Sequence, residues 1–434
     1  METRNIIAAI SLSAAVIILY TLFFAPPPLT QENIGEKNKI EENSDAPSLD
    51  QKENITEISR EQALSESERI KFENKSVIGS ISLKGASIDD LTFKEYNVIL
   101  NGNEKVNLLA PRNSKEGYLI ESGFITTDKN VKIPNSESIW SISGNNKLTA
   151  QSPIKLTWNN DQGIIFEKEI SIDDKFLFTV KQRIINSTSN KYDFYSYGQI
   201  IRNEAPEITN FYILHEGLIA TLDDELIEED YDDIEEKKFA RTAEKGWLGI
   251  GDKYWITSLI PPKGKEFKTT FDYKNKFRAN FVATEPLELN SNSSIEDKMQ
   301  VIVAAKRVDV IDGYAETLKI DKFDLTIDWG FLYFITKPLF FGIDYFFKLL
   351  GNYGLAIIAI TICIRLAFFP LANFSFRSMA KMKALQPEMV RLKELHKDDK
   401  MKLQQAMMAL YKKEKVNPMS GCLPILVQIP VFFA

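Results

Sequence analysis

The sequence predicts a multi-part membrane protein: an N-terminal transmembrane helix, a large antiparallel β-sandwich, and an α-helical membrane core that is incomplete. Three observations indicate this fold class. Uncharged apolar runs lie near both ends of the 434 residues, period-two alternation fills the middle, and a short basic segment separates two late apolar runs. The net charge is −7, so the remainder of the chain is acidic, which is typical of segments on opposite sides of a membrane.

Residues 1–25 are predicted to be a transmembrane anchor, because Ile6–Ala25 carries no charge and is about 20 residues long, enough to cross roughly 30 Å of hydrocarbon. A cleaved signal peptide is the alternative, although the run is long for one and Pro26 follows a poor cleavage site. Residues 26–75 are predicted to be a disordered linker, since no aromatic residue occurs from Pro26 to Lys71.

Residues 76–320 are predicted to be an exported β-sandwich. Alternating or β-branched segments at 77–83, 154–158 and 176–180 indicate strands, and Asn101-Gly102 is a turn signal. The acidic run 223–236 is interpreted as a solvated loop in preference to a metal site. Residues 308–319 are predicted to form the helix that ends this domain.

Residues 328–350 are rich in aromatic side chains, beginning with Trp329. Three charges interrupt them at helical spacings of seven and four, which places Lys337, Asp344 and Lys348 on one face. This pattern predicts an amphipathic helix lying in the membrane interface. A true span is the alternative, and the three charges weigh against it because each costs about 2.5–3.5 kcal/mol inside a bilayer.

Residues 353–372 are predicted to be a second transmembrane helix that contains a single charge, Arg365. An intramembrane arginine usually faces a wet cavity or a partner. The alternative is that its long side chain snorkels to the inner headgroups. Its position along the helix does not separate these two interpretations.

Residues 373–421 are predicted to form a cytoplasmic helical hairpin, with apolar residues recurring every three or four positions and a break at 396–399. The segment contains 11 basic and five acidic residues, which predicts a cytoplasmic location. Methionine suits promiscuous apolar contacts, so candidate contacts for a partner are Met379, Met382, Met389, Met407 and Met408. The alternative is that these side chains only pack the two arms together.

Residues 422–434 form an apolar run of 13 residues, too short to cross a bilayer. We therefore expect the start of a third transmembrane helix and a chain that is truncated there. The basic hairpin places the N-terminus in the cytoplasm and residues 26–350 in the periplasm.

The sequence contains no motif typical of catalysis or energy coupling: no phosphate-binding loop, no HExxH and no GxSxG. His215 and His396 lack metal-ligand spacing, and the only cysteines, Cys363 and Cys422, lie in the apolar C-terminal part. We expect no enzyme activity, no metal, no cofactor and no binding of nucleic acid.

Four stretches resemble the YidC/Oxa/Alb family of membrane protein insertases: DWGFLYFITKPLF at 328–340, GNYGLAIIAITICIRLAFFPL at 351–371, SMAKMKALQPEM at 378–389 and MMALYKKEKVNPMSGCLPILVQIPVFFA at 407–434. The exported region is similar to the large periplasmic domain of the Gram-negative branch, a β-super-sandwich related in shape to sugar mutarotases. Its best local match is GWLGIGDKYWITSLIP at 246–261.

The resemblance implies a bacterial inner-membrane insertase and chaperone that acts alone or with the Sec translocon. It implies that Arg365 contacts substrate in a hydrophilic groove open to the cytoplasm, whose walls include helices beyond residue 434. The hairpin would receive nascent membrane proteins, the ribosome or the signal recognition particle receptor, and residues 328–350 would lie on the bilayer. The alternatives are a membrane-tethered carbohydrate-binding or sugar-processing domain, and a structural scaffold of a translocon.

Overall fold

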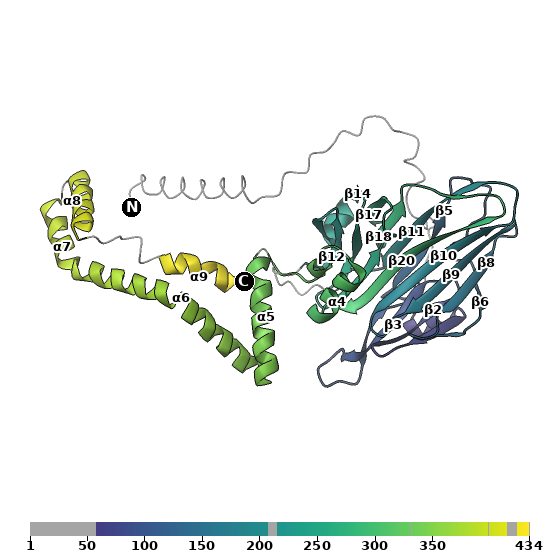
Figure 1. The fold of residues 1–434 in the computed structure, drawn as a ribbon, viewed down its shortest axis with the longest axis horizontal. Helices are drawn as coiled ribbons and strands as arrows, with labels where there is room; N and C mark the ends of the chain where they lie inside the picture. Colours follow the sequence, from purple (N-terminus) through teal and green to yellow (C-terminus); the bar gives the residue numbers. More distant parts are fainter. Residues whose placement is uncertain (1–57, 207–214, 331, 398, 415–422, 434) are drawn as a thin grey trace, which may run out of the picture. The chain divides into compact units, whose positions relative to one another are not determined.

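A computed structural model of the chain describes residues 58–206, 215–330, 332–397, 399–414 and 423–433. The predicted anchor over residues 1–25, the linker up to residue 57, and Cys422 lie outside these residues. In the part that is described, two large β-sheets come first and a series of helices follows (Figure 1). The predicted order of a large β-sandwich and then a helical segment is confirmed.

The sandwich consists of two sheets whose strand pairs are antiparallel except for one short parallel pair at an edge. The first sheet has the order β14 (Phe239–Ala243), β17 (Phe267–Tyr273), β18 (Phe277–Ala283), β11 (Tyr192–Arg202), β5 (Tyr118–Ile125), β3 (Ile88–Asn97), β2 (Val77–Ser82), β1 (Arg69–Glu73) and β7 (Lys147–Leu148), with β4 (Lys105–Leu109) beside β3 and β19 (Leu287–Leu289) beside β11. The second has the order β13 (Glu225–Asp230), β12 (Gly217–Leu222), β15 (Gly246–Gly251), β16 (Trp255–Ile260), β20 (Ser293–Ala305), β10 (Leu177–Asn186), β9 (Ile164–Ile172), β8 (Ile154–Asn159) and β6 (Ser141–Ser143).

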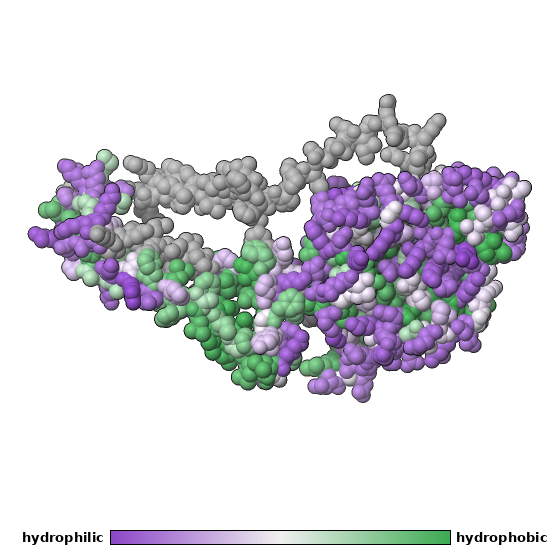
Figure 2. Space-filling model, viewed as in Figure 1, coloured by the Kyte–Doolittle hydropathy of each residue, from purple (hydrophilic) through white to green (hydrophobic). Residues whose placement is uncertain are grey.

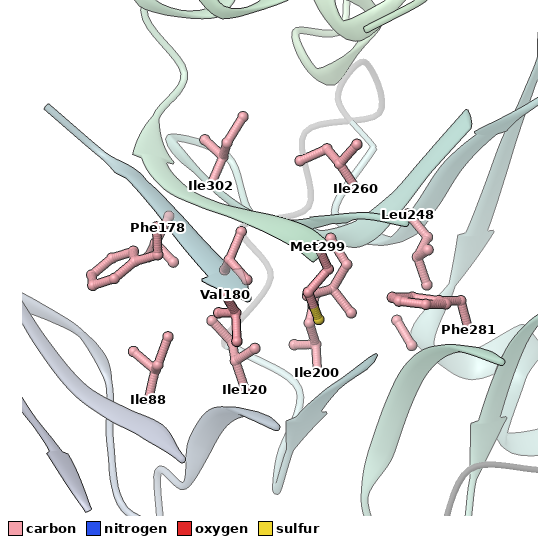
Figure 3. Close-up of a cluster of buried hydrophobic side chains, with 14 of the residues drawn as sticks. Ile88, Ile120, Phe178, Val180, Ile200, Leu248, Ile260, Phe281, Met299 and Ile302 are labelled. Carbon is pink, nitrogen blue, oxygen red and sulfur yellow. The ribbon is translucent and has the colours of Figure 1, made fainter. Parts of the chain in front are cut away.

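The core lies between the two sheets and is built from alternate residues of their strands (Figure 3). In β10, Phe178 and Val180 are buried between the sheets, whereas Lys181, the residue directly after Val180, is exposed. Ile120 of β5 and Ile88 of β3 approach them from the opposite sheet. The period of two that predicted strands is thus the same property that forms the core.

The folded domain begins earlier than the expected residue 76. Helix α2 (Arg60–Ser65) starts at a capping box, in which Ser59 and Gln62 each accept a hydrogen bond from the other's backbone N–H. Strand β1 follows, and its Ile70 and Phe72 are fully buried. The low aromatic content of this region hid a strand with only two core residues.

The acidic run 223–236 was expected to be a loop, and that expectation is wrong. It contains strand β13 and helix α3 (Tyr231–Glu236). Tyr231 and Ile234 are buried and hold the helix on the sandwich, whereas the carboxylates face outward. No group of three or more possible metal ligands occurs among the described residues.

Two short elements end the sandwich. Helix α4 (Val308–Leu318) matches the prediction to within one residue, and its Lys319 cap is left-handed. The 3₁₀ turn η1 (Phe323–Thr326) follows. Phe323 packs edge-on against Trp247 with ring centroids 5.2 Å apart, so the turn is anchored to the β15–β16 hairpin.

The helices after the sandwich are α5 (Tyr333–Leu350), α6 (Tyr353–Ala384), α7 (Gln386–Leu395), α8 (Lys400–Lys413) and α9 (Leu423–Phe433). The expected boundary at 372–373 falls inside α6, which is 32 residues long in total. The first arm is divided at Leu385 because Pro387 lies in the first turn of α7, where its missing N–H costs no hydrogen bond. Asp399 caps α8 by accepting from the Lys402 N–H at 3.0 Å.

Candidate functional site

The first surface of interest is the junction between the sandwich and α5. The Trp329 indole N–H donates to the Asp324 carbonyl oxygen at 3.1 Å, and its ring meets Phe340 edge-on at 5.5 Å. Trp329 is 7% exposed, so it is a packing residue of this junction. It does not lie free on the surface, as an interfacial anchor would.

Lys337 joins α5 to this junction. Its Nζ lies 2.8 Å from Asp324 Oδ2, 3.6 Å from Asp312 Oδ1 and 5.6 Å from the centroid of the Trp329 ring. Partial burial lowers the pKa of Lys337, but the hydrogen bond and charge of Asp324, aided by Asp312, outweigh this and leave it raised. Lys337 therefore connects α5, through charged contacts, to both α4 and η1.

The other two charges of α5 pair with each other. Lys348 Nζ lies 2.6 Å from Asp344 Oδ2, one helical turn away. All three residues of the predicted charged face, Lys337, Asp344 and Lys348, therefore take part in ion pairs. Next to it runs a row of exposed aromatic side chains: Phe334, Phe341 and Tyr345, which are 61%, 45% and 64% exposed.

Helices α5 and α6 meet at a tight corner. Gly351 has φ 65°, a left-handed conformation that favours glycine, and Asn352 caps α6 by accepting from the Leu355 N–H at 3.2 Å. A Cβ on Gly342 would lie 2.8 Å from Ile360 Cδ1, so the two helices pack closely at that point. Phe347 and Tyr353 stack across the corner with centroids 4.1 Å apart.

Helix α6 is the one helix of the described residues that is long and apolar enough to cross a membrane. Its surface is largely apolar (Figure 2). Arg365 lies on it and is exposed, with no ion-pair partner among the described residues. Its helical face also carries Ile358, Ile362 and Phe369, which are 57%, 54% and 62% exposed.

The five candidate methionines of the two arms divide into two sets. Met382, Met389 and Met407 are half-buried, and the Tyr411 hydroxyl donates to Met389 Sδ at 3.8 Å. Met379 and Met408 are 45% and 52% exposed. The structure therefore gives packing roles to part of the set and leaves the remainder on the surface.

Sequence reasoning missed a polar cavity of about 390 Å³ in the sandwich. Three ion pairs line it: Arg69 with Asp89 and Arg112 with Glu121, which are buried, and Lys84 with Glu137, which is exposed. Burial raises the pKa of Asp89 to about 6, although Arg69 acts in the opposite direction. The lining residues come from several strands, helix α2 and the connections between them, so no local pattern in the sequence indicates the cavity.

A large β-sandwich followed by an aromatic helix, a long helix whose apolar part contains Arg365 and a pair of helical arms is the architecture of a membrane-anchored protein with an extramembrane domain. Residues 69–341 match the family model of the YidC periplasmic domain, and residues 345–434 match that of the 60Kd inner membrane protein. The membrane protein insertase YidC of Pelagibacter ubique is 74% identical over 435 residues, covering 100% of this chain and 78% of that protein. The insertase YidC of Rickettsia prowazekii is 40% identical over 440 residues, covering 99% and 78%.

The chain belongs to the YidC family of membrane protein insertases, a family of inner-membrane proteins. The family resemblance and the membrane protein insertase function that it implied are thereby confirmed. Among solved structures, an active YidC insertase with its first transmembrane domain resolved matches with 16% identity and a TM-score of 0.29, over 84% of this chain and 70% of that one. A galactose mutarotase related enzyme from Lactobacillus acidophilus matches with 10% identity and a TM-score of 0.40, over 55% and 97%.

Proposed function

We propose that this insertase moves short hydrophilic segments of nascent membrane proteins into the bilayer along a polar surface that includes Arg365. The observation that carries the proposal is the position of Arg365 on an exposed face among Ile358, Ile362 and Phe369. A guanidinium on a lipid-facing surface is costly, so this face favours a hydrated groove. A substrate carboxylate would pair with Arg365 and cross part of the bilayer with a smaller loss of solvation.

We further propose that the mechanism is non-enzymatic. The helix lowers the barrier to transfer by offering charge and water inside the membrane, and no bond is made or broken. The rival function, sugar processing by the exported domain, has one supporting observation, the polar cavity lined by Arg69 and Asp89. Incubation of the whole chain with monosaccharides, followed by NMR, would show neither binding nor turnover under our proposal.

The proposed topology is multi-pass. The basic segment 373–421 lies in the cytoplasm, α6 crosses the membrane, α5 lies in the outer interface, and residues 26–350 face the periplasm. A cysteine at Lys397 should react with a membrane-impermeant maleimide only after the inner membrane is opened. Reaction in intact spheroplasts would reverse the orientation of α6 and refute the scheme.

The two arms are proposed to receive substrates, and Met379 and Met408 are the exposed candidates for apolar contact. The Sec translocon, the ribosome and the signal recognition particle receptor are proposed partners on the basis of the family resemblance. In this scheme the half-buried Met382, Met389 and Met407 preserve the shape of the arms.

The test of the groove compares Arg365→Ala with Arg365→Lys in an insertion assay that uses a small membrane protein with an acidic exported tail. We expect Arg365→Ala to reduce protease-protected product roughly five- to tenfold, and Arg365→Lys to reduce it less, because the lysine keeps the charge. Leu366→Ala, at a neighbouring exposed position, is the matched control. Equal insertion by Arg365→Ala and the wild type would favour snorkelling of the arginine.

A further inference from the structure

The hairpin that joins β3 to β4 ends in three consecutive exposed aliphatic residues. Val98, Ile99 and Leu100 are 57%, 71% and 89% exposed, and Leu100 is the most exposed large apolar side chain of the described residues. Single exposed apolar residues are ordinary on protein surfaces, but three together on a projecting tip are not. Figure 1 shows this hairpin extending beyond the body of the sandwich, and Figure 2 shows apolar atoms on it next to a hydrophilic surface.

The tip is a defined turn. The Gly102 N–H donates to the Ile99 carbonyl oxygen at 2.8 Å, and the Val98 N–H donates to the Glu104 carbonyl oxygen at 2.9 Å. Asn101 has φ 62°, which asparagine tolerates in turns. These bonds close the chain reversal and place Leu100 at its corner.

The base of the hairpin is packed firmly on the sandwich. The ring of Phe93 stacks on Trp255 with centroids 4.7 Å apart, and Tyr96 meets Trp255 edge-on at 5.1 Å. Beside Trp255, Tyr254 is 60% exposed, and Lys253 Nζ lies 5.2 Å from the centroid of its ring. A tyrosine with a lysine next to it is typical of the membrane–water interface.

This end of the sandwich also adjoins the interfacial helix. Arg307, directly before α4, lies 3.8 Å from Glu95 of β3, and Asp312 of α4 lies 3.6 Å from Lys337 of α5. Strand β3, which leads into the hairpin, therefore contacts the residue that begins α4, and α5 contacts α4 itself. If α5 lies on the bilayer, the tip is at the membrane-facing end of the sandwich.

We propose that Val98, Ile99 and Leu100 insert into the outer leaflet of the lipid bilayer, with Tyr254 at the headgroup level. This inference rests on the proposed interfacial position of α5. Lipid is the favoured occupant because the tip projects from the sandwich and its exposed apolar side chains are all aliphatic, whereas protein partners usually bind aromatic or arginine side chains in well-packed pockets. The contact would hold the sandwich at a set height above the membrane.

The test places a nitroxide at Leu100 in the whole chain, in a Cys363→Ser, Cys422→Ser background, reconstituted in nanodiscs of phosphatidylethanolamine and phosphatidylglycerol. We expect relaxation by oxygen, which dissolves in lipid, to exceed relaxation by a water-soluble nickel chelate at least roughly threefold relative to a label at Ile139. Ile139 is a matched control, since it is a 63% exposed aliphatic residue of the same domain. A label at Ile99 repeats the measurement at the next side chain.

A label at Tyr345 of α5 separates the possible failures. If Tyr345 reports lipid while Leu100 resembles Ile139, the tip proposal is wrong and the placement of α5 stands. If both positions report water, the interfacial position of α5 fails as well. If Leu100 is shielded from oxygen and nickel alike, a protein surface covers the tip and the lipid proposal is overturned.

Discussion

Lys337 of α5 and Asp324 of η1 form an ion pair, with Nζ 2.8 Å from Oδ2, that links the aromatic helix to the end of the sandwich. We expect Lys337→Met to broaden the distance distribution between spin labels at Tyr345 and Ile139, because it removes this pair and the contact with Asp312. The expected loss of stability is about 1 kcal/mol, since the lysine is only partly buried. Lys337→Arg should keep the narrow distribution, and a broad distribution in both variants would show that packing at Trp329, not charge, sets the geometry.

Asp89 should make the sandwich more stable in mild acid. Its pKa is raised from 3.8 to about 6 in the folded protein, so protonation favours the native state. This contribution is complete below pH about 3.8, is lost as the pH rises through about 6, and amounts to about 3 kcal/mol. Asp89→Asn cannot titrate, so the difference in unfolding free energy between the wild type and this variant should change across that range. Chemical unfolding of both proteins at several pH values would measure it, and a constant difference would contradict the prediction.

Gly342→Val should weaken the packing of α5 on α6. The added atoms would meet Ile360, and overpacking of this kind costs about 1–3 kcal/mol. Ile360→Ala in the same chain should restore much of the lost thermal stability by making space. Gly313→Ala is the control, since a Cβ at that position of α4 meets nothing within 4 Å. If Ile360→Ala does not restore thermal stability, the loss caused by Gly342→Val does not arise from contact with Ile360.

Trp247→Ala should destabilise the sandwich by about 3–5 kcal/mol, because the side chain is fully buried against Phe323. Ile139→Ala, at an exposed position of the same domain, should change the unfolding free energy by less than about 0.5 kcal/mol. Urea titration of the two variants would measure both values. Similar midpoints for the two variants would show that η1 is not anchored through this tryptophan.

The exposed methionines should affect substrate contact more than the folding of the arms. We expect Met379→Ser with Met408→Ser to lower photo-crosslinking to a nascent membrane protein roughly three- to fivefold, with helix content unchanged. Met389→Ser should instead lower helix content, because Met389 is half-buried and contacts Tyr411. If the double variant crosslinks normally, the methionines serve only to pack the arms.

Some features of the site follow from local sequence alone. The spacing of Lys337, Asp344 and Lys348 predicted one charged helical face, and the i, i+4 pair of Asp344 and Lys348 is its direct result. The break between the arms was visible because the apolar spacing stops at 396–399, and in the structure Asp399 caps the helix that follows. The division of the first arm at Leu385 was missed, since the apolar spacing continues across Pro387.

By itself the sequence determined the order of the parts, the family and the periodic faces of strands and helices. All three can be read from contiguous segments of the chain, and the periodic faces depend only on residues a few positions apart. Only the tertiary structure decided that Lys337 reaches Asp312 and Asp324, that Asp89 is buried in a polar cavity, and that Leu100 projects from the sandwich. These relationships depend on which distant strands and helices become neighbours. Burial and electrostatic partners are set by that packing, and no window of adjacent residues contains the information.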